Sequence, residues 1–160
     1  MDLAQVITPV RTDDRWFSFD VPVGWAQGRG AFGGLVLGAM LRAMQASEPA
    51  TERRLRSLAG ELVGPVVPGA STIEVVVLRR GNGVSTLEAL LRQGGEVLAR
   101  ATAVLGKSRD IDRRWSPPDR AAATPWIDVV PVPVGLPFVP EFSRHFEYRI
   151  TGPAPFSGAR

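Results

Sequence analysis

Residues 28–46 read GRGAFGGLVLGAMLRAMQA, and this stretch decides the fold. The part from Phe32 to Ala46 predicts a helix that is apolar on almost every side. A helix without a polar face has to be enclosed by other elements. Gly34 and Gly38 lie one turn apart, so another backbone can approach the helix closely there. The sequence Ser47-Glu48-Pro49 ends the helix. We therefore expect one long central helix inside the protein.

The segments on either side of this helix are typical of β-strands. Before it, residues 15–21 read RWFSFDV, in which aromatic and polar residues alternate as in a half-buried strand. The turns RGNG at 80–83 and GG at 94–95 are short enough to join the strands beside them into an antiparallel meander. The strands expected after the helix are residues 56–63, 72–78, 84–93 and 97–105. The pattern predicts an α+β fold, with an antiparallel sheet wrapped around one long central helix.

Residues 1–108 contain all of these elements and form the predicted domain. Prolines punctuate residues 109–143, which predicts a linker or an arm that follows the surface. Residues 144–150, RHFEYRI, then match the apolar positions of residues 15–21. We expect residues 144–160 to begin a second, incomplete copy of the domain. The alternative is an added strand that closes the sheet of this unit or of a partner.

Composition and charge exclude several classes of function. The 160 residues include no cysteine, which excludes disulfides and thiolate chemistry, and no spacing of metal ligands is present. The net charge is +3, but the arginines are scattered, so we expect no nucleic-acid partner. The N-terminal residues show no secretory leader, and the longest apolar run is too short to span a bilayer. These observations predict a cytoplasmic protein without membrane insertion.

Residues 25–42 read WAQGRGAFGGLVLGAMLR, residues 55–69 read LRSLAGELVGPVVPG, and residues 99–106 read ARATAVLG. Together they resemble the acyl-CoA thioesterase II-like family, many of whose members are tandem hot-dog proteins. The resemblance implies a hot-dog fold, acyl-CoA thioesters as substrates and no separate cofactor. Active sites in this family lie between two hot-dog units, which implies a homodimer or a higher homo-oligomer. In the tandem members, the carboxylate, hydroxyl and amide residues that act on a water lie mainly in the C-terminal unit.

The turn that enters the helix is the strongest candidate site. Backbone N–H groups at a helix start have no intrahelical partner, and the helix dipole adds positive potential there. The backbone at Gly33 and Gly34 can therefore stabilise the oxyanion that develops when a thioester carbonyl is attacked. The alternative is that both glycines only let the helix pack closely against the sheet.

Four further residues are candidates. Arg29 fits a phosphate of CoA, or it is an ordinary surface arginine. Phe32 lines the acyl pocket, or it is a core aromatic residue, and Gln27 is a candidate for positioning a water. Glu61 is the candidate general base if it faces inward, and a solvent-facing carboxylate if it faces outward.

These residues predict an acyl-CoA thioesterase-like protein. In this hypothesis water attacks the thioester, the products are CoA and a carboxylic acid, and the helix start stabilises the oxyanion. One alternative is a non-catalytic acyl-CoA binding module. The other is the inactive N-terminal part of a tandem hot-dog thioesterase.

Overall fold

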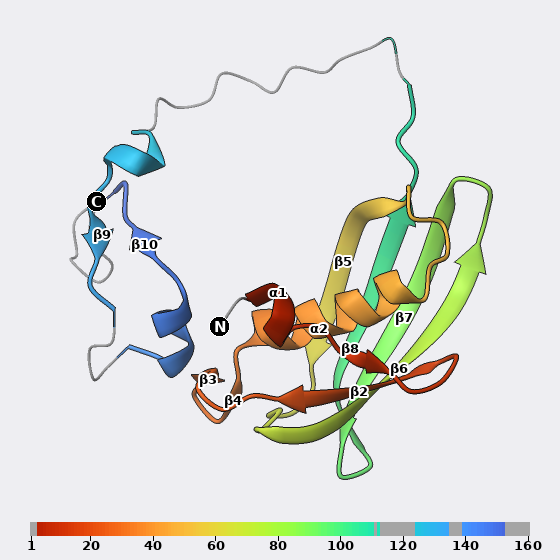
Figure 1. The fold of residues 1–160 in the computed structure, drawn as a ribbon, viewed down its shortest axis with the longest axis horizontal. Coiled ribbons are helices and arrows are strands. Elements are labelled where there is room, and N and C mark those ends of the chain that lie inside the picture. Colours follow the sequence, from red (N-terminus) through yellow and green to blue (C-terminus); the bar gives the residue numbers. More distant parts are fainter. Residues whose placement is uncertain (1–2, 111, 113–123, 135–138, 153–160) are drawn as a thin grey trace. The chain divides into compact units, whose positions relative to one another are not determined.

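The chain divides into two compact units, Met1–Arg109 and Asp110–Arg160. Figure 1 shows the long helix and the large sheet in the first unit. The computed structural model describes residues 3–110, 112, 124–134 and 139–152.

The described part of the first unit contains two helices and eight strands. The helices are α1 (Leu3–Val6) and α2 (Gly33–Ala46). The strands, in chain order, are β1 (Val10–Arg11), β2 (Trp16–Val21), β3 (Ala26–Gln27), β4 (Gly30–Ala31), β5 (Arg54–Leu62), β6 (Gly69–Arg80), β7 (Val84–Gln93) and β8 (Glu96–Gly106).

Six of these strands form one antiparallel sheet in the order β1-β2-β6-β7-β8-β5. The predicted meander is confirmed, because β6, β7 and β8 pair in sequence, with Ile73 opposite Leu91 and Leu91 opposite Ala99. Gly94 and Gly95 have φ angles of 58° and 87°, which suits the tight turn between β7 and β8. β5 pairs with β8. The first strand after the helix is therefore an edge strand.

The alternation seen in the sequence of β2 separates its two faces. Phe17, Phe19 and Val21 are buried, whereas Ser18 and Asp20 are exposed. Burying one such apolar side chain stabilises the fold by about 1.5–3 kcal/mol. The apolar face of the sheet therefore faces α2, which lies across it (Figure 1).

Helix α2 is buried on one side only. Its opposite side is covered in part, since Leu37 and Leu41 are half-buried and Gly34 is exposed. Near Gly38 the cover is Ile7, whose Cδ1 would lie 3.4 Å from a Cβ added to the glycine. The sheet curves around α2 as predicted. The expectation that other elements enclose the helix on every side is wrong, because the single sheet covers only the side that faces it. The buried residues of α2 are Leu35, Val36, Ala39, Met40, Ala43 and Met44.

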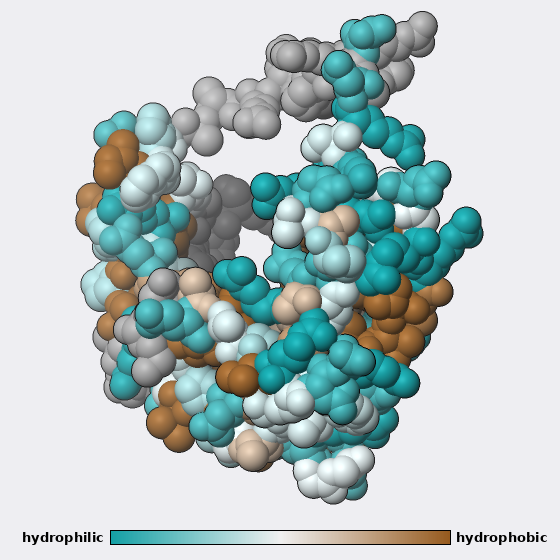
Figure 2. Space-filling model, turned by 45° about the vertical axis from the view of Figure 1, so that its right-hand side comes forward, coloured by the Kyte–Doolittle hydropathy of each residue, from teal (hydrophilic) through white to brown (hydrophobic). Residues whose placement is uncertain are grey.

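The described part of the second unit contains two short 3-10 helices and a two-stranded antiparallel sheet. These elements are η1 (Trp126–Asp128), β9 (Pro131–Val132), η2 (Glu141–His145) and β10 (Tyr148–Arg149). Arg149 holds this unit together, because its Nη1 donates hydrogen bonds to the carbonyl oxygens of Trp126, Ile127 and Val129. Figure 2 shows apolar patches on the surface of both units.

The strand predicted at residues 144–150 is present only in part. Arg144 and His145 belong to η2, and β10 contains two residues. Its partner β9 also contains only two residues, so the ladder consists of two residue pairs. Much of the predicted linker at 109–143, and the end of the segment 144–160, lie outside the described residues.

Candidate functional site

A two-stranded hairpin leads the chain into α2. It consists of β3 and β4, and Gly28 takes a φ of 68° in its turn, a backbone conformation that favours glycine. The hairpin is fixed at its base by Trp25, which is 2% exposed and whose carbonyl oxygen accepts a hydrogen bond from the N–H of Phe32 at 2.8 Å. On its other side, the N–H of Ala31 donates to the carbonyl oxygen of Val66 at 2.7 Å. The hairpin therefore positions the first residue of α2 against the loop that follows β5.

The helix begins without a side-chain cap. Phe32 is the N-cap residue, and its side chain makes no capping hydrogen bond. Its carbonyl oxygen accepts from the N–H groups of Leu35 and Val36, which leaves the N–H groups of Gly33 and Gly34 ahead of the intrahelical bonds. The ring of Phe32 lies against Gly34, in the space that a side chain there would occupy. The helix start therefore presents backbone donors, and Gly34 also has the packing role that the sequence left open.

A pocket of about 350 Å³ opens beside this helix start. Three of the predicted site residues line it: Gln27, Arg29 and Gly33. Gly34 and Phe32 are adjacent to it in sequence but do not contribute to its wall. The remaining lining residues are Gly30, Ala31, Val36, Leu62, Val63, Gly64, Pro65 and Val66.

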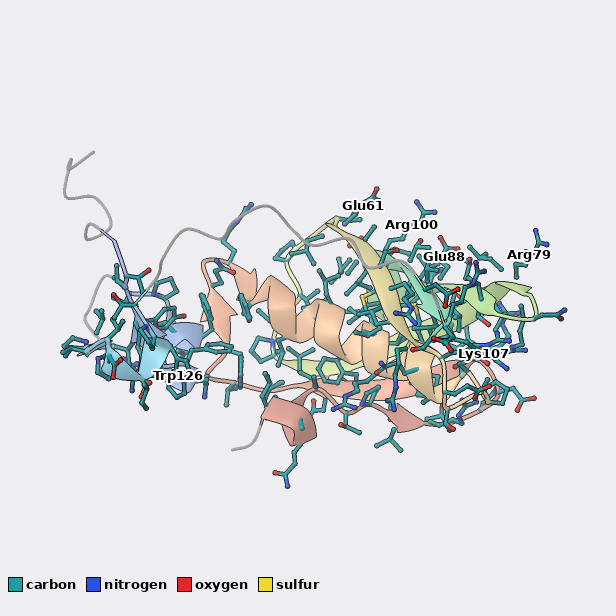
Figure 3. The ribbon with its side chains drawn as sticks, turned by 90° about the horizontal axis from the view of Figure 1, so that it is seen from above. Glu61, Arg79, Glu88, Arg100, Lys107 and Trp126 are labelled. Atoms are coloured by element: carbon teal, nitrogen blue, oxygen red, sulfur yellow. The ribbon has the colours of Figure 1, made fainter. Side chains whose placement is uncertain are left out.

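Glu61 lies on the face of the sheet that points away from α2. Figure 3 shows it beside Arg100 and Glu88, on the opposite side of the strands from the helix. Its carboxylate is 4.0 Å from the guanidinium of Arg100, which is paired more closely with Glu88 at 2.6 Å, and its side chain is 71% exposed. The structure therefore does not bring Glu61 together with Gly33, and it supports the solvent-facing alternative.

The polar chemistry of the pocket is that of a binding site. Gln27 and Arg29 supply its polar side chains, both are exposed, and the described residues give Arg29 no ion-pair partner. No carboxylate or imidazole is among the described residues that line the pocket. In the described part of the chain, no cluster of three or more His, Cys, Asp or Glu residues is arranged to hold a metal ion. The arrangement can hold an anion and a polarised carbonyl, but the described residues that line it offer no general base.

A second hollow, of about 410 Å³, lies beside β1 and β2 at the other edge of the sheet. Its lining includes Thr8, Ser18 and Asp20. Its described lining includes neither a helix start nor a cationic side chain, so we place the candidate site at α2.

Several wall residues of the site were not predicted from the sequence. Pro65 and Val66 were not among the predicted site residues, although the carbonyl oxygen of Val66 accepts the hydrogen bond that positions the hairpin. Leu62 and Val36 were also not among the predicted site residues, and both line the pocket. The Gly64-Pro65 turn was the available signal, but the pairing of β5 with β8, which brings this turn to α2, is not readable from it.

Comparison with known proteins gives one family. The family profile described as acyl-CoA thioesterase N-terminal domain matches residues 21–106. This range contains the hairpin, α2 and the four strands that follow it. No curated protein sequence matches the chain.

Solved structures show the same fold. A conserved hot-dog protein of unknown function from Alicyclobacillus acidocaldarius is 22% identical with a TM-score of 0.81, covering 92% of this chain and 54% of that one. A putative thioesterase II from Thermobifida fusca YX is 20% identical with a TM-score of 0.72, covering 82% and 49%. The acyl-CoA thioesterase II TesB2 of Mycobacterium marinum is 18% identical with a TM-score of 0.67, covering 86% and 56%.

These likenesses show a hot-dog fold, as the sequence predicted. The chain spans about half the length of these solved structures. Among the described helices, none has the length and apolar character needed to cross a bilayer.

Proposed function

We propose that this chain, which belongs to the acyl-CoA thioesterase N-terminal domain family, binds an acyl-CoA thioester at the start of α2 and contributes to its hydrolysis. The observation that carries the proposal is the pocket in which Gly33, Arg29 and Gln27 meet. It combines backbone donors for an oxygen, a cation for a phosphate and an amide for a water.

In the proposed reaction the thioester carbonyl lies against the N–H groups that begin α2. Attack by water places negative charge on the carbonyl oxygen, and donors already aimed at this position lower the barrier without reorganising. The helix dipole acts in the same direction. The C–S bond then breaks, and the products are CoA and a carboxylic acid. Arg29 pairs with a phosphate group of CoA at the rim of the pocket.

The base that activates the water has to come from outside this pocket, because its described lining includes neither a carboxylate nor an imidazole. The free edge of β5 supports a second hot-dog unit as the source. All nine residues of this strand are exposed except Leu58, which is half-buried, and the pocket opens at its end through Leu62 and Val63. A long exposed edge strand is a template for pairing with another chain. We therefore propose a homodimer or a higher homo-oligomer, in which the second unit completes the site.

A second candidate function is a non-catalytic acyl-CoA binding module. The absence of a base among the described lining residues favours it. One experiment separates the two functions. The chain has no cysteine, so a thiol reagent does not react with the protein itself. A thiol reagent added to the protein and an acyl-CoA therefore reports only the CoA that is released.

The experiment combines this assay with calorimetric binding of the same acyl-CoA and with sedimentation analysis of the protein. Release of CoA by an oligomer supports the hydrolase. Binding without release supports the binding module. If the protein neither binds nor hydrolyses any acyl-CoA in a series from acetyl to palmitoyl, both functions are excluded.

A further inference from the structure

Helix α2 and strand β5 contact each other along a seam formed by two leucine–glycine contacts. In each contact, a leucine of one element lies against a glycine of the other. Leu62 of β5 lies against Gly33, where an added Cβ would be 2.8 Å from its Cδ1. Leu37 of α2 lies against Gly60, in the space that a side chain there would occupy. Gly33 and Leu37 are four residues apart and share one side of the helix. Gly60 and Leu62 are two residues apart and share one face of the strand.

The described lining of the pocket includes both residues of the first contact and neither residue of the second. Leu62 belongs to its wall, and the lining residues that α2 contributes are Gly33 and Val36. The contact between Leu37 and Gly60 lies one step further along the seam, behind Leu62. Leu62 therefore lies between the pocket and the contact of Leu37 with Gly60. Its side chain is free to move, because Leu62 is 53% exposed.

The residues next to Leu62 on the side of the sheet that faces α2 are small or apolar. On β8, Ala99 and Ala101 lie opposite Leu62 and Gly60, and both alanines are buried. Val36, at the inner end of the pocket, is also fully buried. A hydrocarbon chain that packs against these residues gains by leaving water.

We propose that Leu62 and Leu37 together limit the length of the acyl chain that this pocket accepts. Leu62 sets the depth of the pocket, and Leu37 closes the seam behind it. This inference rests on the proposed function, because it requires the acyl group to enter at Gly33. The ligands are straight, saturated acyl chains, and a chain that reaches past Leu62 has to displace it.

The test compares the wild-type protein with Leu62→Ala and with the double variant Leu62→Ala/Leu37→Ala. Binding of each acyl-CoA from acetyl to palmitoyl is measured by calorimetry, together with CoA release. We expect each variant to prefer longer chains than the wild type does. Each methylene that newly enters apolar surroundings should raise the affinity about fourfold. Leu55→Ala is the matched control, since Leu55 is an exposed leucine at the far end of the same strand, and it should leave the preference unchanged.

Circular dichroism and thermal unfolding check that the variants are folded. If the double variant is unfolded, the single variant Leu62→Ala still tests the inference. A preference that moves to longer chains in Leu62→Ala but not in Leu55→Ala supports the inference. If the wild type binds acyl-CoA and Leu62→Ala keeps its preference, the inference is wrong and the proposed function stands. If the wild type binds no acyl-CoA of any length, the proposed function fails and the inference fails with it.

Discussion

Leu62 fills the space that a side chain on Gly33 would occupy, with its Cδ1 2.8 Å from the position of an added Cβ. Gly33 also lies on the pocket wall and begins α2. The same residue therefore accepts a leucine from β5 and leaves the helix start open to a ligand. Gly34 differs, since it lies against the ring of Phe32 and outside the pocket wall. The roles of these two adjacent glycines can therefore be distinguished by mutation.

Gly33→Ala should weaken acyl-CoA binding and change stability little. The new methyl group narrows the pocket, while Leu62 can move away because it is half-exposed. Gly34→Ala should lower stability and change acyl-CoA binding little. Its methyl group meets the aromatic ring of Phe32, and overpacking of this kind costs about 1–3 kcal/mol. Calorimetric affinity and the free energy of unfolding in urea measure the two effects. Equal losses of affinity in both variants would contradict this assignment.

Arg29→Gln should weaken the binding of CoA compounds about tenfold and make their binding less sensitive to salt, because it removes a cation from the rim of the pocket. Affinity is measured at several ionic strengths. Arg79→Gln is the matched control, since Arg79 is also exposed but lies on β6, outside the pocket (Figure 3). If Arg79→Gln reduces affinity as much as Arg29→Gln, the effect is one of net charge and the phosphate contact is not supported.

Gln93 holds the loop that forms one wall of the pocket. Its Nε2 donates to the carbonyl oxygen of Val67 at 2.7 Å, and its Oε1 accepts from the N–H of the same residue at 2.9 Å. Val67 follows Val66, which holds the hairpin through Ala31. We expect Gln93→Leu to lower acyl-CoA affinity several-fold and stability by about 1–2 kcal/mol.

Gln93→Glu is the informative control for this loop. It keeps the acceptor for the N–H of Val67 but loses the donor to its carbonyl oxygen. Its affinity should lie between those of the wild type and Gln93→Leu. Full affinity in Gln93→Leu would show that the loop keeps its position without this side chain.

A buried ion pair holds the far end of α2. The carboxylate of Glu48 is 3.5 Å from the guanidinium of Arg53, and both side chains are almost fully buried. Burial acts to raise the pKa of Glu48, but hydrogen bonds from Ser85, the backbone of Ala50 and Arg80, with the charge of Arg53, lower this pKa overall. A carboxyl group whose pKa is lowered by folding stabilises the protein above its ordinary pKa, and this stability is lost as the pH falls through the folded value.

Glu48→Gln should therefore reduce the free energy of unfolding at neutral pH by about 3–5 kcal/mol, because Arg53 stays buried without its counter-charge. The difference from the wild type should shrink as the pH falls below the ordinary carboxyl range. Urea unfolding at several pH values measures both effects. Glu52→Gln is the control, since it removes a solvent-exposed pair with Lys107 and should change the free energy of unfolding little. A constant difference at all pH values would contradict the assignment to Glu48.

The sequence was sufficient for the parts of the fold that depend on local pattern. The apolar run after Gly33 predicted α2, and the Gly94-Gly95 turn predicted the pairing of β7 with β8. The position of β5 was not predictable, because pairing at a distant edge leaves no local signal. The face on which Glu61 lies depends on that pairing, so the sequence left it open. Within residues 144–150, only Tyr148 and Arg149 pair with another strand, and the length of that partner strand is not readable from the local sequence.

The central claim is that the start of α2 binds the thioester group of an acyl-CoA. The most direct measurement is an amide NMR titration of the protein with an acyl-CoA analogue whose thioester is replaced by an amide. If the analogue binds at this helix start, the amide signals of Gly33 and Gly34 should shift saturably, together with signals from the loop at Gly64. Saturable shifts confined to other parts of the chain, or no shifts at any concentration of the analogue, would contradict the central claim.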